Sequence, residues 1–266
     1  MIGAIIGDVV GSRFERNNIK TKDFALFSTE CRPTDDSVMS LAIANAILEA
    51  GNDYAKLSKR AVSNMQKLGR KYKNAGYGGK FRGWLFEDNP SPYNSFGNGA
   101  GMRVGPCGFA ATTIEEAKLL SASVTMVTHN HPEGMKGAEA VAVATFLAKD
   151  GMSKEDIRKY IQDNYYDVNF TIDGIRDSYK FDVSCQGSVP QALVSFFDGN
   201  DFEDTIRNAI SIGGDSDTIA AMAGAVAEAY YGVPKALVES VMDYLEDDMK
   251  KILGDFEKKY PAKIIE

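Results

Sequence analysis

Two long helices without a polar face constrain the fold of this chain more than any other feature of its sequence. They are expected over residues 38–50 and 218–231, and the second is rich in alanine. A helix that is apolar on all sides cannot lie on the surface of a protein, so other elements must surround each of them. Alternating runs of β-branched residues, which are typical of strands, are scarce. The sequence therefore predicts an all-α fold.

Helical periodicity predicts further helices and one long irregular region. The helices are expected over residues 53–72, 115–123, 135–149, 153–164, 190–197, 202–212 and 235–253. Ser153 followed by Asp156 forms a capping box, which marks the start of one of them. Glycine, proline, asparagine and serine crowd residues 74–108, which we interpret as a long functional loop. No repeat, linker or charge block divides the chain, so a single domain over residues 1–266 is expected.

Composition limits the partners and the compartment. The 30 basic and 37 acidic side chains give a net charge of −7, so general binding to nucleic acid is not expected. Cys31, Cys107 and Cys185 are far apart in the sequence, which argues against disulfides and zinc sites and favours a reducing cytoplasm. The apolar start of the sequence lacks a basic flank, and no uncharged apolar stretch is long enough to cross a bilayer. We therefore predict a cytoplasmic protein that binds no membrane.

Oxygen-bearing side chains gather at the start of each apolar helix. The residues are Thr34, Asp35 and Asp36 at the first helix and Asp215, Asp217 and Thr218 at the second. Helix capping accounts for one or two such residues, and for either cluster alone it remains the alternative. Each cluster offers two carboxylates plus hydroxyl groups, however, and charges beside a core helix are costly unless they are paired or bind metal. We therefore predict that the two clusters converge on two hard divalent ions, Mg²⁺ or Mn²⁺.

Glycines recur every four residues near the beginning of the sequence. Gly3, Gly7 and Gly11 would line one face of a helix and allow close contact with another helix. Packing between helices is enough to explain these glycines. It does not explain Glu15, which follows at the next position on the same face.

Two other motifs carry candidate ligand contacts. The first is the glycine-rich turn formed by Asn98, Gly99, Ala100, Gly101, Met102 and Arg103. Such a turn, where it leads into a helix, can present backbone N–H groups to phosphate oxygens, and Arg103 either adds a charge or caps a surface acid. The second motif holds the only two histidines, His129 and His131. Two histidines are too few for a metal-dependent amidohydrolase barrel, so His129 is either a substrate contact or a hydrogen-bonded structural residue.

Five segments, taken in order, resemble the ADP-ribosylglycohydrolase family. They are GDVVGSRFE at 7–15, TDDS at 34–37, NGAGMR at 98–103, THNHPEGMKGAEA at 128–140 and GGDSDTIAAMAGA at 213–225. The resemblance implies a compact orthogonal array of helices with a dinuclear magnesium or manganese centre at the base of an ADP-ribose cleft. It further implies that the six residues of the two acidic clusters bind the metals and that Glu15 lies near the scissile bond. The turn at 98–103 would hold the diphosphate, and His129 would lie beside the distal ribose or the adenosine.

The activity implied by this resemblance is the removal of ADP-ribose from a modified protein side chain or a small conjugate, by a monomeric enzyme. Divalent ions would orient the ribose and position a water, and Glu15 would act as general base or assist the leaving group. Two alternatives stay open: an inactive ADP-ribose-binding protein and a magnesium-dependent phosphohydrolase. The acids present at positions 15, 35, 36, 215 and 217 argue against the first. The identity of the leaving group, whether arginine, serine or an O-acyl ester, does not follow from the sequence.

Overall fold

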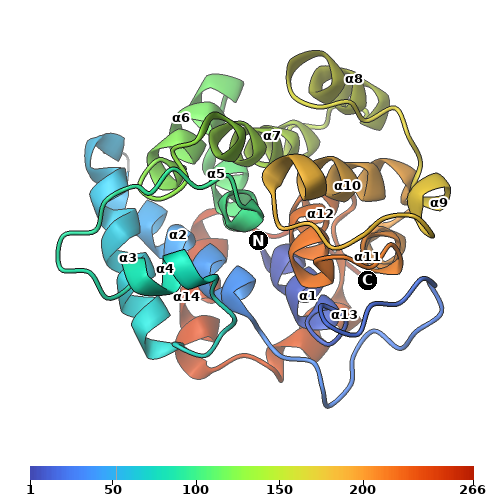
Figure 1. The fold of residues 1–266 in the computed structure, drawn as a ribbon, viewed down its shortest axis with the longest axis horizontal. Helices are drawn as coiled ribbons and strands as arrows, with labels where there is room; N and C mark the ends of the chain where they lie inside the picture. The colour runs from blue at the N-terminus through green and yellow to red at the C-terminus, as the bar shows by residue number, and fades with distance from the viewer. Residues whose placement is uncertain (52) are drawn as a thin grey trace.

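Helix α12 (Ser216–Tyr231) is the central element of the molecule (Figure 1). Residues 216–229 of this helix are all buried, and it contacts helices α1, α7, α10 and α11. Helix α2 (Asp35–Ala50) is the other apolar helix and contacts α1, α3, α5 and α14, while its Glu49 reaches the surface. Both helices that the sequence predicts to be apolar are therefore packed inside a shell of other helices.

The computed structural model describes residues 1–51 and 53–266, and these residues contain fourteen α-helices. The remaining helices are α1 (Ile2–Gly11), α3 (Leu57–Lys71), α4 (Gly79–Trp84), α5 (Gly105–Ala110), α6 (Ile114–Thr125), α7 (Pro132–Lys149), α8 (Lys154–Asn164), α9 (Ile172–Ile175), α10 (Cys185–Asp198), α11 (Phe202–Ser211), α13 (Lys235–Met242) and α14 (Asp247–Lys259). In the described part of the chain, strands are limited to a two-residue parallel pair, β1 (Val233–Pro234) with β2 (Ile264–Ile265). The predicted all-α class is confirmed.

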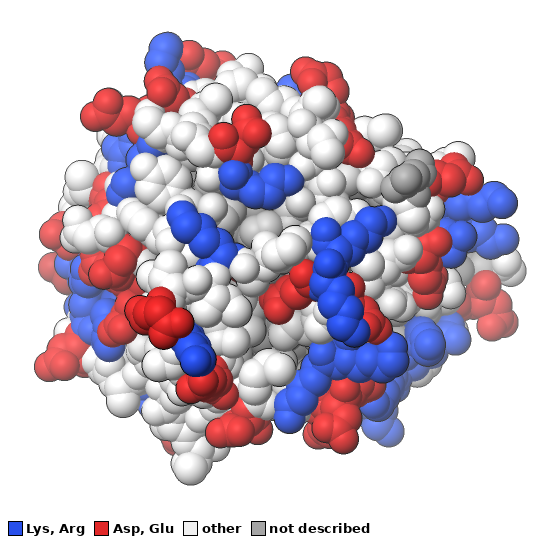
Figure 2. All heavy atoms as spheres, turned by 180° about the vertical axis from the view of Figure 1, so that it is seen from behind, with Lys and Arg blue, Asp and Glu red and all other residues white. Residues whose placement is uncertain are grey.

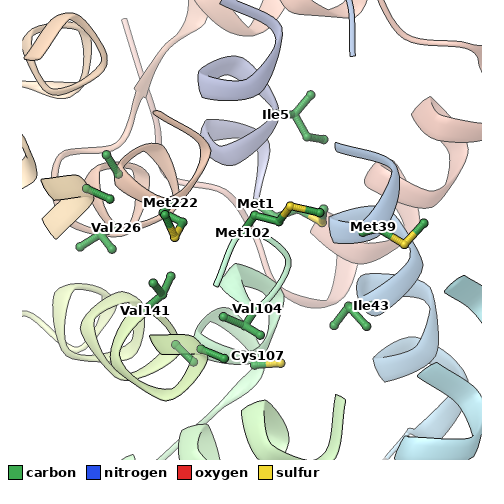
Figure 3. Close-up of a cluster of buried hydrophobic side chains, with 14 of the residues drawn as sticks. Met1, Ile5, Met39, Ile43, Met102, Val104, Cys107, Val141, Met222 and Val226 are labelled. Carbon is green, nitrogen blue, oxygen red and sulfur yellow. The ribbon is translucent and has the colours of Figure 1, made fainter. Parts of the chain in front are cut away.

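Aliphatic side chains fill the space where α1, α2, α7 and α12 meet (Figure 3). Ile5, Ile43, Val141 and Val226, one from each of these helices, are fully buried. Each such side chain stabilises the fold by about 1.5–3 kcal/mol relative to exposure to water. This core fixes α2 and α12, which both carry acidic residues in their first turns, in one relative position.

Side-chain caps start several helices. Ser153 accepts a hydrogen bond from the amide of Asp156 at 3.1 Å and donates one to its carboxylate at 2.7 Å, so the predicted capping box is confirmed. The helix start predicted at residue 190 is wrong. Helix α10 begins at Cys185 because the Ser184 hydroxyl accepts from the amide of Gly187 at 3.1 Å, and Pro190 lies inside the helix.

The helix expected over residues 235–253 is interrupted. It is divided into α13 and α14 by a turn at residues 243–246, where Leu245 is buried. The change of direction allows Val241 of α13 and Phe256 of α14 both to reach the core.

The region 74–108, expected to be a loop, contains short helices. Helices α4 and α5 and the 3₁₀ helix Asn98–Ala100 lie within it. Phe81 and Trp84 anchor α4, because both side chains are buried and their rings stack with centroids 5.4 Å apart. Two aromatic contacts with the core thus order a segment whose local composition favours turns.

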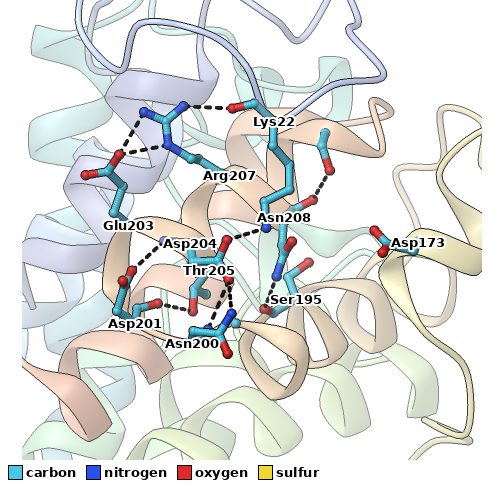
Figure 4. A network of polar contacts seen from close by, with 12 residues as sticks. Lys22, Asp173, Ser195, Asn200, Asp201, Glu203, Asp204, Thr205, Arg207 and Asn208 are labelled. Atoms are coloured by element: carbon cyan, nitrogen blue, oxygen red, sulfur yellow. Dashed lines mark hydrogen bonds and ion pairs between the residues drawn. The ribbon is translucent and has the colours of Figure 1, made fainter.

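A network of polar contacts holds the segment between α1 and α2 against α11 (Figure 4). Arg207 donates to the backbone oxygens of Lys22 at 2.8 Å and Phe24 at 2.7 Å, and it pairs with Glu203 at 2.7 Å. The ammonium group of Lys22 pairs in turn with Asp204. Since this segment ends at Thr34, the network also restrains the approach to the first acidic cluster.

The described residues contain no disulfide and no helix suited to span a membrane. Cys31, Cys107 and Cys185 are buried free thiols. Across residues 1–51 and 53–266, no helix has both the length and the apolar character needed to span a bilayer. On the face opposite to that of Figure 1, basic side chains lie next to acidic ones (Figure 2).

Candidate active site

The two acidic clusters meet at one cavity of about 650 Å³. Six of its lining residues are Thr34, Asp35, Asp36, Asp215, Asp217 and Thr218. The hydroxyl of Thr218 donates to Asp36 at 3.2 Å, across 182 positions of sequence, and the hydroxyl oxygen of Thr34 lies 3.3 Å from the same carboxylate oxygen. The first turns of α2 and α12 therefore face each other across the wall of a cavity large enough for a dinucleotide-sized ligand.

Asp8 is a site residue that the sequence reasoning missed. Its side chain, on α1, is fully buried, and one carboxylate oxygen each of Asp8, Asp36 and Asp217 lie within 4.8 Å of one another. Asp8 accepts from the amide of Thr34 at 2.9 Å, the amide of Ser37 at 3.0 Å, the Thr34 hydroxyl at 2.6 Å and the Ser37 hydroxyl. Asp8 thus caps α2 from a different helix.

A signal for Asp8 was present in the sequence. It is the only charged residue in the run from Met1 to Gly11, which is otherwise apolar. A carboxylate in a buried helix requires hydrogen-bond donors or a cation, and this requirement marks Asp8 as a residue with a specific partner. The partner itself could not be read from the sequence, because it comes from a loop 26 positions away.

Glycines in α1 bring Asp8 next to α12. A Cβ atom added to Gly7 would lie 2.1 Å from the backbone oxygen of Ala220, and one added to Gly11 would lie 2.5 Å from Cα of Asp217. The predicted glycine contact between helices is therefore confirmed, and α12 is the partner. The two backbones touch at the level where Asp8 and Asp217 carry their carboxylates.

The electrostatics of the cluster favour a cation. Burial raises the pKa of Asp8, Asp36 and Asp217, and repulsion from neighbouring carboxylates adds to the shift in the latter two. Burial, followed by the charge of Asp8, raises the pKa of Asp35 to about 7, and burial raises that of Asp215 to about 6. Within the described residues, no lysine or arginine forms an ion pair with any of these five groups.

The donor set fits a hard divalent ion. Carboxylates and threonine hydroxyls offer oxygen alone, which suits Mg²⁺ or Mn²⁺ better than zinc. Oδ1 of Asp36 is buried and has no hydrogen-bond partner among the described residues. A buried oxygen of this kind is costly without a donor or a cation.

Glu15 lines the cavity, although not from a helix. Helix α1 ends at Gly11, and Phe14 bonds back to Gly11 at 2.8 Å in the turn that follows. The expectation that Glu15 continues the glycine face of the helix is therefore wrong. The turn leaves the Glu15 side chain 26% exposed and beside the acidic cluster, where its charge raises the pKa of Asp215 and Asp217.

The turn at residues 98–103 forms another wall of the cavity. Asn98 donates to Asp215 at 2.6 Å and so ties the turn to the second acidic cluster. Gly99 and Met102 line the cavity, whereas Ala100 is fully buried and Gly101 packs against Met222.

The amides of this turn are mostly engaged. Those of Ala100, Gly101 and Met102 donate to backbone oxygens of Gly97 or Asn98. In the part of the chain that is described, the amide of Gly99 has no such bond. The predicted display of several free amides therefore narrows to those of Gly99 and Arg103, and Arg103 is a buried residue.

Arg103 is a buried cation at the cavity. Its side chain is 1% exposed, so the alternative that it caps a surface acid is wrong. Its Nη2 donates to the Thr128 hydroxyl at 2.6 Å, and its Nε has no partner among the described residues. Burial lowers its pKa to about 10, so the group stays charged at neutral pH.

The two histidines have different roles. His131 caps α7, because its Nδ1 accepts from the amide of Glu133 at 3.1 Å. His129 is 5% exposed, lines the cavity, and lies with its ring 5.8 Å from that of Tyr93. Burial, reinforced by Arg103, holds the pKa of His129 well below its ordinary value, so the ring is neutral.

Comparison with known proteins gives a consistent set of similarities. Residues 1–262 match the family described as ADP-ribosylglycohydrolase. The human protein named ADP-ribosylhydrolase ARH3 is 26% identical over 94% of this chain and 90% of its own length. A Pseudomonas putida protein named ADP-ribosylarginine hydrolase Tri1 is 27% identical over 91% of this chain and 72% of its own length.

A solved structure extends this likeness to three dimensions. The structure titled ADP-ribosylglycohydrolase-related protein complex matches with a TM-score of 0.68 and 20% identity, over 97% of this chain and 95% of that one. At this identity the match supports the fold alone. The resemblance predicted from five short motifs therefore extends over nearly the whole chain.

Proposed function

Because this chain belongs to the ADP-ribosylglycohydrolase family, we propose that its cavity binds an ADP-ribosylated protein side chain or a small ADP-ribose conjugate and releases ADP-ribose. The chain is a glycosidic-bond hydrolase by family, as are the relatives named ADP-ribosylhydrolase. The observation that carries the proposal is the meeting of two acidic segments at one cavity, with Asp36 bonded to Thr218 at 3.2 Å.

Two Mg²⁺ or Mn²⁺ ions would be held between the acidic segments. Their ligands would come from Thr34, Asp35, Asp36, Asp215, Asp217 and Thr218. Bound divalent ions supply charge that orients ribose hydroxyls and makes a nearby water more acidic. Asp8 positions this set of ligands, since its hydrogen bonds fix Thr34 and Ser37 at the start of α2.

Glu15 is the residue that moves a proton in this proposal. Cleavage of an ADP-ribosyl bond develops positive charge at the anomeric carbon of the distal ribose. The Glu15 carboxylate, which is open to the cavity, accepts a proton from the attacking water or assists the departing group. The carboxylates of the acidic clusters beside Glu15 add negative charge near the carbon at which positive charge develops.

The wall of the cavity formed by residues 98–103 would hold the diphosphate. Arg103 contributes a buried positive charge without an ion pair in the described residues, and Gly99 contributes a free amide. His129 would contact the ligand beside them. Local contacts of this kind bind an anion without a basic protein surface, in agreement with the net charge of −7.

A panel of linkages tests this proposal. ADP-ribose joined to arginine, to serine and to an O-acetyl group would be incubated with the protein, with Mg²⁺ or with a chelator. Release of intact ADP-ribose that requires Mg²⁺ is expected from at least one of them. The name of the Pseudomonas putida relative makes arginine the first linkage to examine.

The alternatives give different products. Release of AMP would favour a magnesium-dependent phosphohydrolase. Tight binding of ADP-ribose without turnover of any linkage would favour an inactive binding protein.

A further inference from the structure

Arg103, Thr128 and His129 form a chain of hydrogen bonds beside the cavity. Nη2 of Arg103 lies 2.6 Å from the Thr128 hydroxyl oxygen, which in turn lies 2.7 Å from Nδ1 of His129. All three residues are buried. Since a guanidinium group can only donate, the Thr128 oxygen must accept from Arg103.

The proton of the Thr128 hydroxyl has two possible acceptors. One is Nδ1 of His129 at 2.7 Å, and the other is the backbone oxygen of Thr125 at 3.5 Å. The shorter contact is of ordinary hydrogen-bond length and the longer one is marginal. The hydroxyl therefore donates to Nδ1 of His129, which must carry a lone pair there.

The position of Arg103 leads independently to the same conclusion. Its Nη2 lies 3.5 Å from Nδ1 of His129. A proton on Nδ1 would lie beside a guanidinium group that has only hydrogens to offer. Two donors thus face Nδ1, and a neutral imidazole with Nδ1 bare carries its proton on Nε2.

Nε2 faces the glycine turn. A Cβ atom added to Gly99 would lie 3.5 Å from Nε2, and one added to Gly97 would lie 3.7 Å from it. Both glycines and His129 line the cavity. In the described residues Nε2 has no hydrogen-bond partner, so its proton is available to a ligand.

We propose that Arg103 and Thr128 are positioning residues that hold His129 as a neutral Nε2–H donor directed into the cavity. The oxygen that it meets belongs to the bound ligand. That ligand is ADP-ribose if the proposed function holds, whereas the tautomer itself is a property of the ligand-free protein. The direction of the His129 pKa agrees with a neutral ring, and Arg103 and Tyr93 are the ionisable groups that face it among the described residues.

Nitrogen NMR of the ligand-free protein tests the tautomer. The chain contains two histidines, so ¹⁵N-histidine labelling gives two ring spin systems, which a His129→Gln variant assigns. We expect a protonated Nε2 and a bare Nδ1 for His129, unchanged from about pH 5.5 to about pH 8. A protonated Nδ1, or titration of the ring in this range, would overturn the proposal.

Variants of Thr128 test whether its hydroxyl links Arg103 to His129 and so fixes the tautomer of the ring. Thr128→Val removes the hydroxyl at nearly constant shape, whereas Thr128→Ser keeps it. We expect mixed tautomers and about tenfold weaker ADP-ribose binding in the valine variant, and the wild-type spectrum in the serine variant. If the valine variant does not fold, a serine variant with a changed tautomer would still contradict the role of the hydroxyl.

The two proposals can fail separately. A wild-type protein with the Nε2–H tautomer that binds no ADP-ribose would disprove the proposed function and leave the positioning role of Arg103 and Thr128 standing. ADP-ribose binding that is equally strong in the wild type and in Thr128→Val, with a single unchanged tautomer in both, would disprove the positioning role alone.

Discussion

Asp8 lies on a helix whose every residue is buried, and its carboxylate joins the two acidic segments to α1. Replacement by asparagine keeps one oxygen for the amides of Thr34 and Ser37 and removes a negative charge. We expect Asp8→Asn to raise the melting temperature in a chelator, because repulsion from Asp36 and Asp217 falls. We also expect about tenfold weaker Mg²⁺ binding, measured by calorimetry.

A matched variant separates charge from position in this experiment. Asp150→Asn, at the exposed end of α7, removes the same charge far from the cavity. It should change neither quantity. A loss of melting temperature for Asp8→Asn in the chelator would mean that Asp8 acts as a cap whose charge is needed, and not as a source of repulsion.

Glu15 has a catalytic role in this account. Glu15→Gln preserves the size of the side chain and removes the base, so we expect turnover to fall about 10²–10⁴-fold. The affinities for Mg²⁺ and ADP-ribose should remain within about threefold, since the residue is proposed to act on the reacting atoms. Glu30→Gln, an exposed change in the same segment, is the control. Undiminished turnover of Glu15→Gln would remove the proposed role.

The raised pKa values of Asp35, about 7, and Asp215, about 6, make stability depend on pH when divalent ions are absent. The folded protein binds more protons than the unfolded one between the ordinary value of 3.8 and these values. Its stability therefore falls as the pH rises through this window. Carboxylates must be deprotonated to bind a metal ion, so the rise in melting temperature that we expect from Mg²⁺ should be larger at about pH 8 than at about pH 5. An equal rise at both pH values would contradict this linkage.

At the scale of elements, the contact between α1 and α12 sets the geometry of the acidic cluster. A methyl group on Gly7 would lie 2.1 Å from the backbone oxygen of Ala220, which cannot move without moving α12. We expect Gly7→Ala to lower the free energy of unfolding by more than about 2 kcal/mol and to weaken Mg²⁺ binding. Chemical denaturation and calorimetry measure the two effects.

Gly254→Ala is the matched control for the α1 contact. This glycine lies inside α14, and an added Cβ would meet no atom within 4 Å. Better helix propensity should raise stability by about 0.5–1 kcal/mol and leave metal binding unchanged. Equal effects of the two substitutions would show that the backbone contact of Gly7 is unimportant.

Local patterns were sufficient to predict much of the fold. The lack of a polar face on α12 and the capping box at Ser153 are properties of nearby residues, and both predictions were confirmed. The break between α13 and α14 and the ordering of α4 were not predictable. They arise because Leu245 and Trp84 reach a core that is built by other parts of the chain.

In the candidate site, too, some residues were predictable from the sequence and others were not. The acidic clusters were identified by their excess of carboxylates, and their meeting was inferred from chemistry. Asp8 and the Thr128 link to His129 depend on contacts that sequence spacing does not reveal. The single domain over residues 1–266 and the monomeric state stay predictions.

At the scale of the whole molecule, charge couples the two kinds of ligand. Five carboxylates line the cavity, from Glu15 and four aspartates, and an anionic diphosphate would be repelled by them. Two divalent ions would offset most of this local negative charge, so Mg²⁺ should strengthen ADP-ribose binding about tenfold or more. By reciprocity, ADP-ribose should strengthen Mg²⁺ binding by the same factor. Titrations with each ligand in the presence and absence of the other measure this coupling, and equal affinities would disprove it.

The most direct test of the central claim is anomalous diffraction from crystals soaked in Mn²⁺. The account predicts two peaks in the cavity, with oxygen ligands drawn from both residues 34–36 and residues 215–218. Peaks that contact only one of these segments, or an absence of peaks in the cavity at saturating Mn²⁺, would contradict the claim that the segments hold the ions jointly.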